Sequence, residues 1–163
     1  MDRTLRHRMA PGEFLNLVER LDYEQWSAVM DTGFGGILAA RTRLDPWDTS
    51  LNTPNSKLQI YEEDVHATLG LPMGPIEISE GKSSENNIEF LEQWRRRWNI
   101  ERGGPPVGSM DDVILELGGH GHEFIIDFII YVISTCIVAN ANGMCHFRVL
   151  KYLHSVNEIH NYN

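Results

Sequence analysis

The sequence predicts a mostly α-helical single domain over residues 1–163, with a small two-stranded β element near residues 57–78. The length of 163 residues suits one domain. In most segments apolar residues recur at helical spacing, and Gly, Pro, Asn and Asp separate these segments. Two short runs, "KLQIY" and "PIEIS", favour strands. Whether these two strands pair with each other is left open by the sequence.

Two helices are predicted near the N-terminus. Pro11 suits the first turn of the first helix. One stripe of this helix carries apolar residues at positions i, i+3, i+4 and i+7: Phe14, Leu17, Val18 and Leu21. Asp22 is predicted to cap the second helix, because a short side-chain oxygen accepts hydrogen bonds from free backbone N–H groups. The apolar face of the second helix is expected to comprise Trp26, Val29 and Met30.

The middle of the chain is predicted to alternate loops with short elements. Residues 44–56 are rich in Asp, Thr, Asn and Pro and are expected to form a loop. The run "EEDVHATLG" favours a short helix that Gly70 ends. The run "NIEFLEQWRRRWNI" favours a longer helix that "ERGGPPVG" ends. One side of that longer helix is expected to carry Ile88, Leu91, Trp94 and Trp98.

Three further helices are predicted in the C-terminal part. Ser109 is expected to cap the first of them, with Asp112 completing a variant of the capping box. A long apolar helix is expected from about Glu123 to Ala139. The last helix is expected from about Phe147 to Glu158, with four apolar residues on it: Val149, Leu150, Leu153 and Val156.

Charge and cysteine content limit the classes of function. The chain has 14 basic and 23 acidic residues, a net charge of −9, and residues 103–147 contain no Lys or Arg. This balance gives no reason to expect broad affinity for nucleic acid or anionic membranes. The two cysteines, Cys136 in an apolar run and Cys145 in a polar loop, fit a reducing compartment rather than a disulfide framework. The N-terminus lacks the apolar stretch of a secretory signal.

The apolar run "FIIDFIIYVISTCIV", residues 124–138, is shorter than the roughly 20 residues of a membrane span, so we expect a buried helix. Asp127 interrupts this run. Its carboxylate must reach solvent, find a donor or stay protonated. Because Asp127 lies about one turn from Glu123, the first option is favoured. Accordingly, Ile129→Asp or Ile133→Asp should unfold the domain, and Asp127→Asn should be tolerated.

Asp31-Thr32-Gly33 matches the triplet that holds the catalytic carboxylate of aspartic proteases. That chemistry needs a loop after a β-strand and a second Asp, and here the preceding residues have helical spacing. We expect instead that Gly33 adopts the left-handed conformation at a helix end and that Phe34 folds back onto the last turn. Three glycines at Gly33, Gly35 and Gly36 do not match the spacing of a nucleotide-binding loop.

Two other clusters are candidates for sites. His120 and His122, with Cys145-His146 further on, could ligate a metal, but zinc sites usually show paired spacings, so the histidines are expected at a glycine-rich helix start. Arg95–Arg97 fan over about 200° of a helix and do not form one face. We expect a solvated helix side, with the stems of the arginines covering Trp94 and Trp98. No catalytic, cofactor-binding or metal-binding residue is assigned, and no cofactor is expected.

The order of three segments resembles the plant mobile domain, also called the aminotransferase-like mobile domain. These segments are "WSAVMDTGFGGIL", "EEDVHATLGLPMGPIEI" and "KYLHSVNEIHNYN", and the resemblance covers roughly residues 14–163. Its most specific piece is "EDVHATLGLPMG". The resemblance implies a helical, nuclear, transposon-related domain without established catalytic residues. The family usually continues beyond the position of Asn163, which leaves open a C-terminally truncated fragment or a degenerate copy.

The aminotransferase label of that family would require a lysine that holds pyridoxal phosphate. Lys57, Lys82 and Lys151 lie in no recognisable phosphate-binding context. We therefore expect a non-enzymatic helical protein-interaction module of transposon origin, nuclear and linked to transposon silencing or chromatin and gene regulation. The expected partner is a protein of unknown identity, with no membrane, no tight duplex DNA ligand, and a homo-oligomer if the chain is a fragment.

Two alternatives remain at this point. One is a transposon-derived nucleic-acid-binding module that uses Arg95–Arg97 and the basic N-terminus. The other, more remote, is a retroelement aspartic-type hydrolase that uses Asp31-Thr32-Gly33.

Overall fold

A computed structural model describes residues 11–39, 67, 74–76, 85–116, 119–137, 142–153 and 155–161. This part of the chain is mostly helical, as predicted. The α-helices are α1 (Pro11–Arg20), α2 (Tyr23–Val29), α3 (Gly35–Ala39), α5 (Glu85–Arg97), α6 (Met110–Glu116) and α7 (His122–Val132). The π-helical turns are η1 (Met30–Phe34) and η4 (Ile133–Ile137), and the 3-10 turns are η3 (Val107–Ser109), η5 (Phe147–Tyr152) and η6 (Val156–Asn161).

The predicted two-stranded β element is not supported. The run "KLQIY" lies outside the described residues, and the described part of "PIEIS" is Pro75 and Ile76. The backbone N–H of Ile76 donates to the carbonyl of Asn161 in η6 at 2.9 Å. Within the described ranges there is no strand, and the isolated bridge that pairs two described residues joins Pro106 to Met144. The predicted loop at residues 44–56 and most of the predicted helix "EEDVHATLG" also lie outside the described residues.

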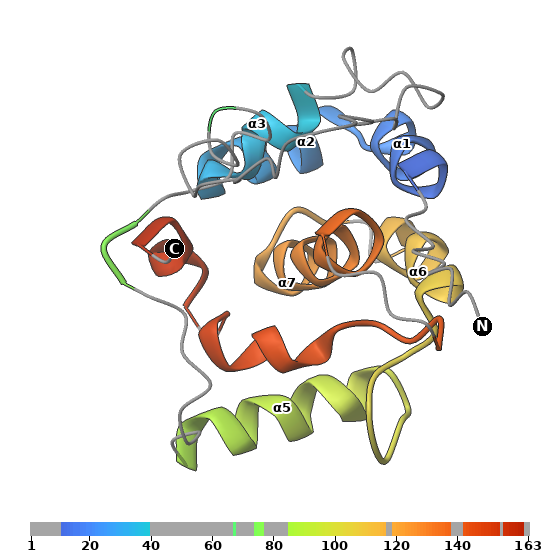
Figure 1. Cartoon of the computed structure of the whole chain (residues 1–163), viewed down its shortest axis with the longest axis vertical. Helices are drawn as coiled ribbons and strands as arrows, with labels where there is room; N and C mark the ends of the chain where they lie inside the picture. Colours follow the sequence, from blue (N-terminus) through green and yellow to red (C-terminus); the bar gives the residue numbers. More distant parts are fainter. Residues whose placement is uncertain are drawn as a thin grey trace, which may run out of the picture.

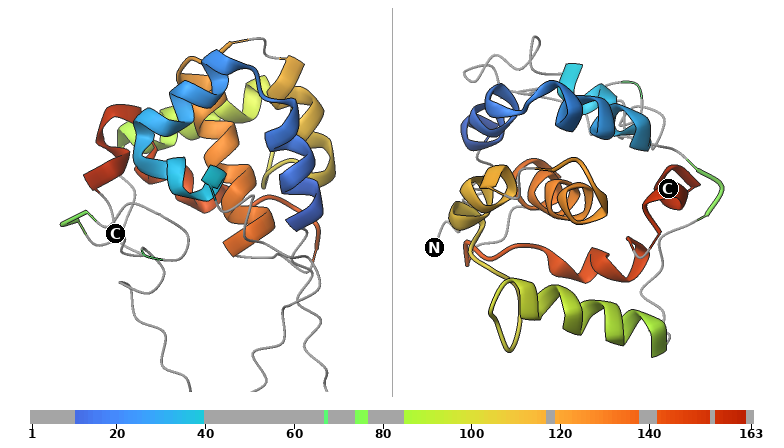
Figure 2. Two further views of the ribbon diagram at one scale, coloured as in Figure 1. Left: turned by 90° about the horizontal axis from the view of Figure 1, so that it is seen from above. Right: turned by 180° about the vertical axis from the view of Figure 1, so that it is seen from behind.

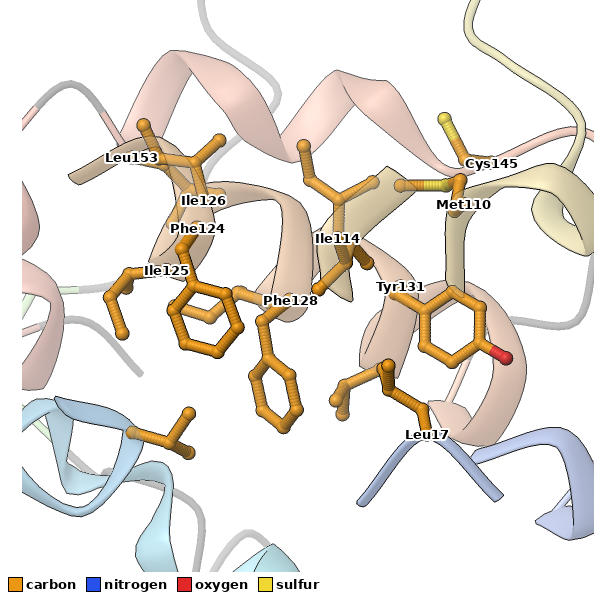
Figure 3. Packing of buried hydrophobic residues seen from close by; sticks show 14 of the residues in the cluster. Leu17, Met110, Ile114, Phe124, Ile125, Ile126, Phe128, Tyr131, Cys145 and Leu153 are labelled. Carbon is orange, nitrogen blue, oxygen red and sulfur yellow. The ribbon is translucent and has the colours of Figure 1, made fainter. Parts of the chain in front are cut away.

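Helix α7 lies at the centre of the fold. Figure 1 and Figure 2 show it between a layer formed by α1, α2 and α3 and a second layer formed by η5 and α5, with α6 beside it. Every residue from Phe124 to Val132 is buried, as the predicted all-round apolar helix requires. Figure 3 shows α7 side chains reaching toward Leu17 on one side and Leu153 on the other. Apolar side chains from both layers therefore join one cluster around α7.

The first two helices begin as the sequence predicts. The stripe of α1 is buried at Phe14, Leu17 and Val18. The Asp22 carboxylate accepts from the backbone N–H of Gln25 at 2.8 Å, and the Gln25 side chain accepts from the Asp22 N–H at 3.1 Å. This reciprocal pair is a capping box, which satisfies two free N–H groups of α2. The side chain of Gln25 is buried in consequence.

One residue predicted for the apolar face of α2 lies elsewhere. Met30 is 50% exposed, because the helix changes to the π-helical turn η1 at this residue and the buried stripe rotates away from it.

Gly33 adopts the predicted left-handed conformation, with φ 85° and ψ −5°. The chain does not leave the helical path there, because α3 follows directly and Gly33 marks a kink between two helical segments. The Thr32 hydroxyl donates to the carbonyl of Val29 at 2.7 Å and accepts from the N–H of Phe34 at 3.3 Å. These bonds occupy backbone groups that the kink would otherwise leave free.

Replacing Gly33 should test the need for this conformation. Gly33→Ala is expected to lower the free energy of unfolding by about 1–2 kcal/mol, because a Cβ disfavours the left-handed region. Gly108→Ala is the matched control: a Cβ there meets no atom within 4 Å, and its φ is not positive. Equal unfolding midpoints in urea for the two variants would contradict the assignment.

Helix α5 ends earlier than "ERGGPPVG" predicts. Asn99 has a positive φ of 53°, its N–H donates to Arg96 O at 3.1 Å, and the N–H of Ile100 donates to Arg95 O at 3.0 Å. This is a Schellman motif with Asn in the glycine position. Of the residues predicted for one side of α5, Trp94 is buried, whereas Ile88 in the first turn is 52% exposed.

The capping role predicted for Ser109 is wrong. Its hydroxyl donates to the carbonyl of Pro106 at 2.9 Å inside η3, so the chain is already turning before α6 begins. Asp112 instead accepts from Arg20 at 2.9 Å, which joins α6 to α1. The tertiary partner replaces the local capping contact.

The predicted last helix consists of two 3-10 turns, η5 and η6, separated near Leu153. Leu150 and Leu153 are buried as expected. The separation lets η5 lie along α5 while η6 packs on η1 and α7, a path that one straight helix could not follow (Figure 1).

Cys145 lies in the loop that the sequence predicts, but its side chain is buried in the core. Its backbone N–H donates to Pro105 O at 3.0 Å, and a Cβ at Gly104 would collide with its sulfur. Both cysteines are free thiols. Burial raises the pKa of the Cys145 thiol to about 12 and also raises the pKa of Cys136. Because the thiolate is the reactive form, neither cysteine is suited to act as a nucleophile.

Alkylation should report this burial. In the folded protein near neutral pH, iodoacetamide is expected to modify Cys145 far more slowly than in the urea-unfolded chain, with half-buried Cys136 reacting sooner. Mass spectrometry of the two cysteine peptides measures both rates. Equal rates for Cys145 in the folded and unfolded chains would contradict the position found for it.

Candidate functional site

An open groove of about 900 Å³ lies where α2, the start of α7 and η6 meet. Its apolar floor is formed by Ala28, Ile125 and Val156. Its rim is polar, with carboxylates from α2 and η1 and imidazoles from three positions along the chain. The polar residues of the rim include Tyr23, Glu24, Asp31, His120, His122 and His160. The elements that form the groove come together because each packs on α7 (Figure 1).

Asp31 lies on the rim of this groove and is exposed. It belongs to the π-helical turn after α2, which differs from the post-strand loop that aspartic-protease chemistry uses. Among the described residues, no hydrogen bond or ion pair holds its carboxylate.

His120 and His122 flank Gly121 at the start of α7, the position predicted for them. The His120 Nδ1 atom lies 3.1 Å from Glu24 Oε2, and both side chains are more than half exposed. The His122 ring meets the Phe90 ring edge-on, with centroids 6.0 Å apart. In the part of the chain that the structure covers, no three His, Cys, Asp or Glu side chains gather as a metal site would require. The His146 backbone N–H donates to the Ser134 hydroxyl at 2.7 Å.

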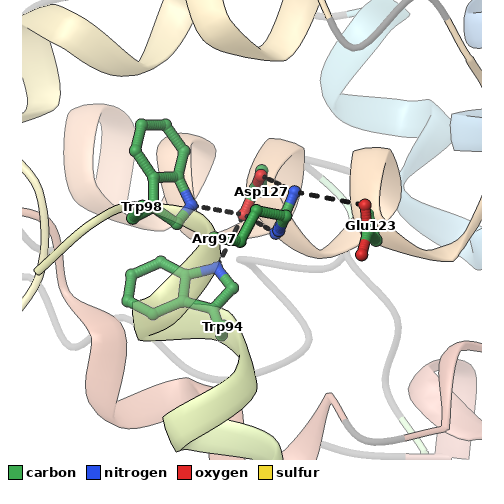
Figure 4. A network of polar contacts seen from close by, with 5 residues as sticks. All are labelled: Trp94, Arg97, Trp98, Glu123 and Asp127. Atoms are coloured by element: carbon green, nitrogen blue, oxygen red, sulfur yellow. Dashed lines mark hydrogen bonds and ion pairs between the residues drawn. The ribbon is translucent and has the colours of Figure 1, made fainter.

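Asp127 does not reach solvent, which overturns the favoured sequence prediction. Its exposure is 0%, and its Oδ1 atom accepts from Trp94 Nε1 at 2.7 Å, Arg97 Nη2 at 2.8 Å and Trp98 Nε1 at 3.2 Å (Figure 4). Its Oδ2 atom lies 2.7 Å from Arg97 Nη1. These two atoms form an ion pair, but their geometry does not meet the angles of a hydrogen bond. Of the three options for this carboxylate, the chain uses the second, which is to find donors.

The chemistry of these partners indicates the ionisation of Asp127. Burial raises the pKa of its carboxyl group, while Arg97 and the two indoles oppose that rise. All the neighbours are donors, and a protonated carboxyl group would need an acceptor for its proton. The arrangement therefore suits a carboxylate. Its low exposure and its position inside the core make this network a structural one rather than a site for a ligand.

The three arginines of "RRR" have different environments, as predicted from their spacing. The Arg95 guanidinium lies 5.3 Å from the centroid of the Phe147 ring, and its Nε donates to Gly103 O at 3.3 Å. Arg96 is exposed and lies 3.6 Å from Glu92. Arg97 enters the core at 21% side-chain exposure and also lies 3.8 Å from Glu123. The expectation of a solvated helix side is wrong for Arg97, because α5 rotates this residue toward Asp127.

A sequence signal for this network was present. Trp94, Arg97 and Trp98 occur at i, i+3 and i+4, so a helix places their donors on one face. The one acid in the apolar run of α7 was a suitable acceptor. Of the lysines considered for a cofactor, Lys151 lies in η5 with Nζ 4.7 Å from the centroid of the Tyr152 ring, and Lys57 and Lys82 lie outside the described residues.

Comparisons with other proteins give a family and no function. Among the described residues, no helix has the length and apolar character needed to cross a membrane. A search of curated proteins and a search of solved structures gave no match. A family model described as "Domain of unknown function (DUF8566)" matches residues 7–163. Because the match covers nearly the whole sequence, the chain belongs to the DUF8566 family.

Proposed function

We propose that this chain is a non-enzymatic protein-interaction module that holds a segment of a partner protein in the groove between α2, the start of α7 and η6. The observation that carries the proposal is the groove itself, an open hollow with an apolar floor and a polar rim. Its volume of about 900 Å³ exceeds what one side chain fills. On its rim, Tyr23 is 84% exposed, and exposed Tyr is enriched in protein interfaces.

The side chains around the groove support binding more than catalysis. The His120–Glu24 pair has the form of an oriented base, but both members are exposed, and among the described residues no hydroxyl or thiol is hydrogen-bonded to this histidine. Neither cysteine is among the residues that line the groove, and burial raises the pKa of both thiols. A binding role uses the shape and charge of the groove without requiring a nucleophile.

Charge favours a protein partner over nucleic acid. The net charge is −9, and Arg97 is already occupied by Asp127. Duplex DNA binding normally needs a basic face. The resemblance to the plant mobile domain supports the further proposal of a transposon-derived nuclear protein linked to silencing or gene regulation.

The test combines the isolation of a partner with a variant in which the groove is blocked. The tagged chain is used to isolate partners from plant nuclear extract, and each purified partner is titrated against wild type, Ser27→Trp and Ile88→Trp. Ser27 lines the groove, so Trp there should fill it and weaken binding at least tenfold. Ile88 is exposed on α5 and serves as the control. Binding that survives Ser27→Trp unchanged in a folded protein, or that requires duplex DNA, would overturn the proposal.

A further inference from the structure

The two carboxylates of the groove lack a cationic partner. Among the described residues, the Asp31 carboxylate has no hydrogen bond or ion pair, and the ion-pair contact of Glu24 is to His120, which is charged only when protonated. Elsewhere in the described part, Arg20, Arg96 and Arg97 each lie against carboxylates. The groove thus differs from those sites in presenting carboxylates with no Lys or Arg against them among the described residues.

Glu24 and Asp31 both line the groove. They are seven residues apart on the continuous path of α2 and η1. None of the described lining residues is Lys or Arg. The groove therefore has a negative rim on a chain whose net charge is also negative, which favours approach of cations and opposes anions.

The apolar floor of the groove suits the aliphatic stem of a Lys or Arg side chain. Lys and Arg bury their aliphatic stems on apolar surface while the charged head stays in water. Ala28, Ile125 and Val156 supply such a surface below the acidic rim. The exposed ring of Tyr23 adds an aromatic face on which a guanidinium or ammonium group can stack.

We propose that the occupant of the groove is a protein segment rich in Lys or Arg, whose cationic heads pair with Glu24 and Asp31 and whose stems lie on the apolar floor. This inference rests on the proposed function and adds the chemistry of the partner. The same carboxylates disfavour nucleic acids and anionic membranes as occupants.

The experiment measures fluorescence anisotropy of two labelled eight-residue peptides. One carries four Lys among Ala and Leu, and the other has Glu in place of each Lys. The wild-type chain is expected to bind the Lys peptide at least tenfold more tightly than the Glu peptide. Glu24→Gln/Asp31→Asn should weaken binding of the Lys peptide by about five- to tenfold, as the loss of two exposed ion pairs allows.

Glu101→Gln/Glu116→Gln is the matched control, because it removes the same net charge from exposed acids outside the groove. This control should change the affinity less than twofold. Equal loss in both double variants would show general attraction to an acidic protein and overturn the inference. Binding of the Lys peptide that is unaffected by Glu24→Gln/Asp31→Asn would also overturn it. All four substituted residues are exposed, so circular dichroism should show unchanged folding.

The Ser27→Trp variant separates this inference from the proposed function. If Ser27→Trp weakens binding of the natural partner but the Lys and Glu peptides bind equally, the groove binds protein and the basic occupant is wrong. If Ser27→Trp leaves partner binding intact and the peptides also bind equally, both proposals fail.

Discussion

Asp127→Asn is expected to lower the free energy of unfolding by about 2–4 kcal/mol, because it leaves the Arg97 guanidinium facing an uncharged amide in the core. The amide NH₂ adds a second difficulty, since every group around this side chain is a donor and a donor would then face donors. The expected loss is below that of a fully buried pair, because Arg97 keeps some exposure and has Glu123 nearby. Urea unfolding followed by tryptophan fluorescence measures it directly.

Two neighbouring arginines provide a second test of this network and its control. Arg97→Met should destabilise by a similar amount, because it leaves the Asp127 carboxylate buried with only the two indole donors. Arg96→Met should change stability by less than about 0.5 kcal/mol, since its contact with Glu92 is an exposed pair. If Asp127→Asn is as stable as wild type, the network does not hold α5 against α7, and the earlier expectation of tolerance returns.

Ile129→Asp is expected to unfold the protein at room temperature. Ile129 is 1% exposed in the middle of α7, and nothing like the Trp94–Arg97–Trp98 set of donors is described beside it. An unpaired carboxylate there should cost about 5 kcal/mol or more, comparable to the whole stability of a small domain. Far-ultraviolet circular dichroism should show loss of helix, and tryptophan fluorescence should show loss of tertiary packing.

Ile137→Asp is the matched control, because Ile137 lies on the same helical path but is 42% exposed. It should leave the protein folded. A folded Ile129→Asp variant would mean that α7 is not the centre of the core. Ile133 lies between these two positions and is half-buried, so Ile133→Asp should lower stability by an intermediate amount. This refines the expectation from the sequence, which was that Ile133→Asp unfolds the domain.

The candidate site shows a limit of sequence reasoning. Asp31, His120 and His122 attracted attention as possible catalytic or metal-binding residues, and the structure brings all three to the rim of one groove. Tyr23, Glu24 and the residues of η6 carried no signal, because nothing in the spacing of α2 shows that the C-terminal turn will pack beside it. The groove is a property of how the elements are arranged around α7.

Local sequence patterns were enough to predict the helical class, the starts of α1 and α2, the cap at Asp22, the left-handed Gly33 and the buried character of α7. These features depend on side chains within a few residues of one another, so local spacing is enough to predict them. The partners of Asp127, the role of Arg97 and the groove depend on how the helices pack against one another. The donors to Asp127 lie 29 to 33 residues away in the chain, and which donor reaches a buried carboxylate depends on how α5 is rotated against α7.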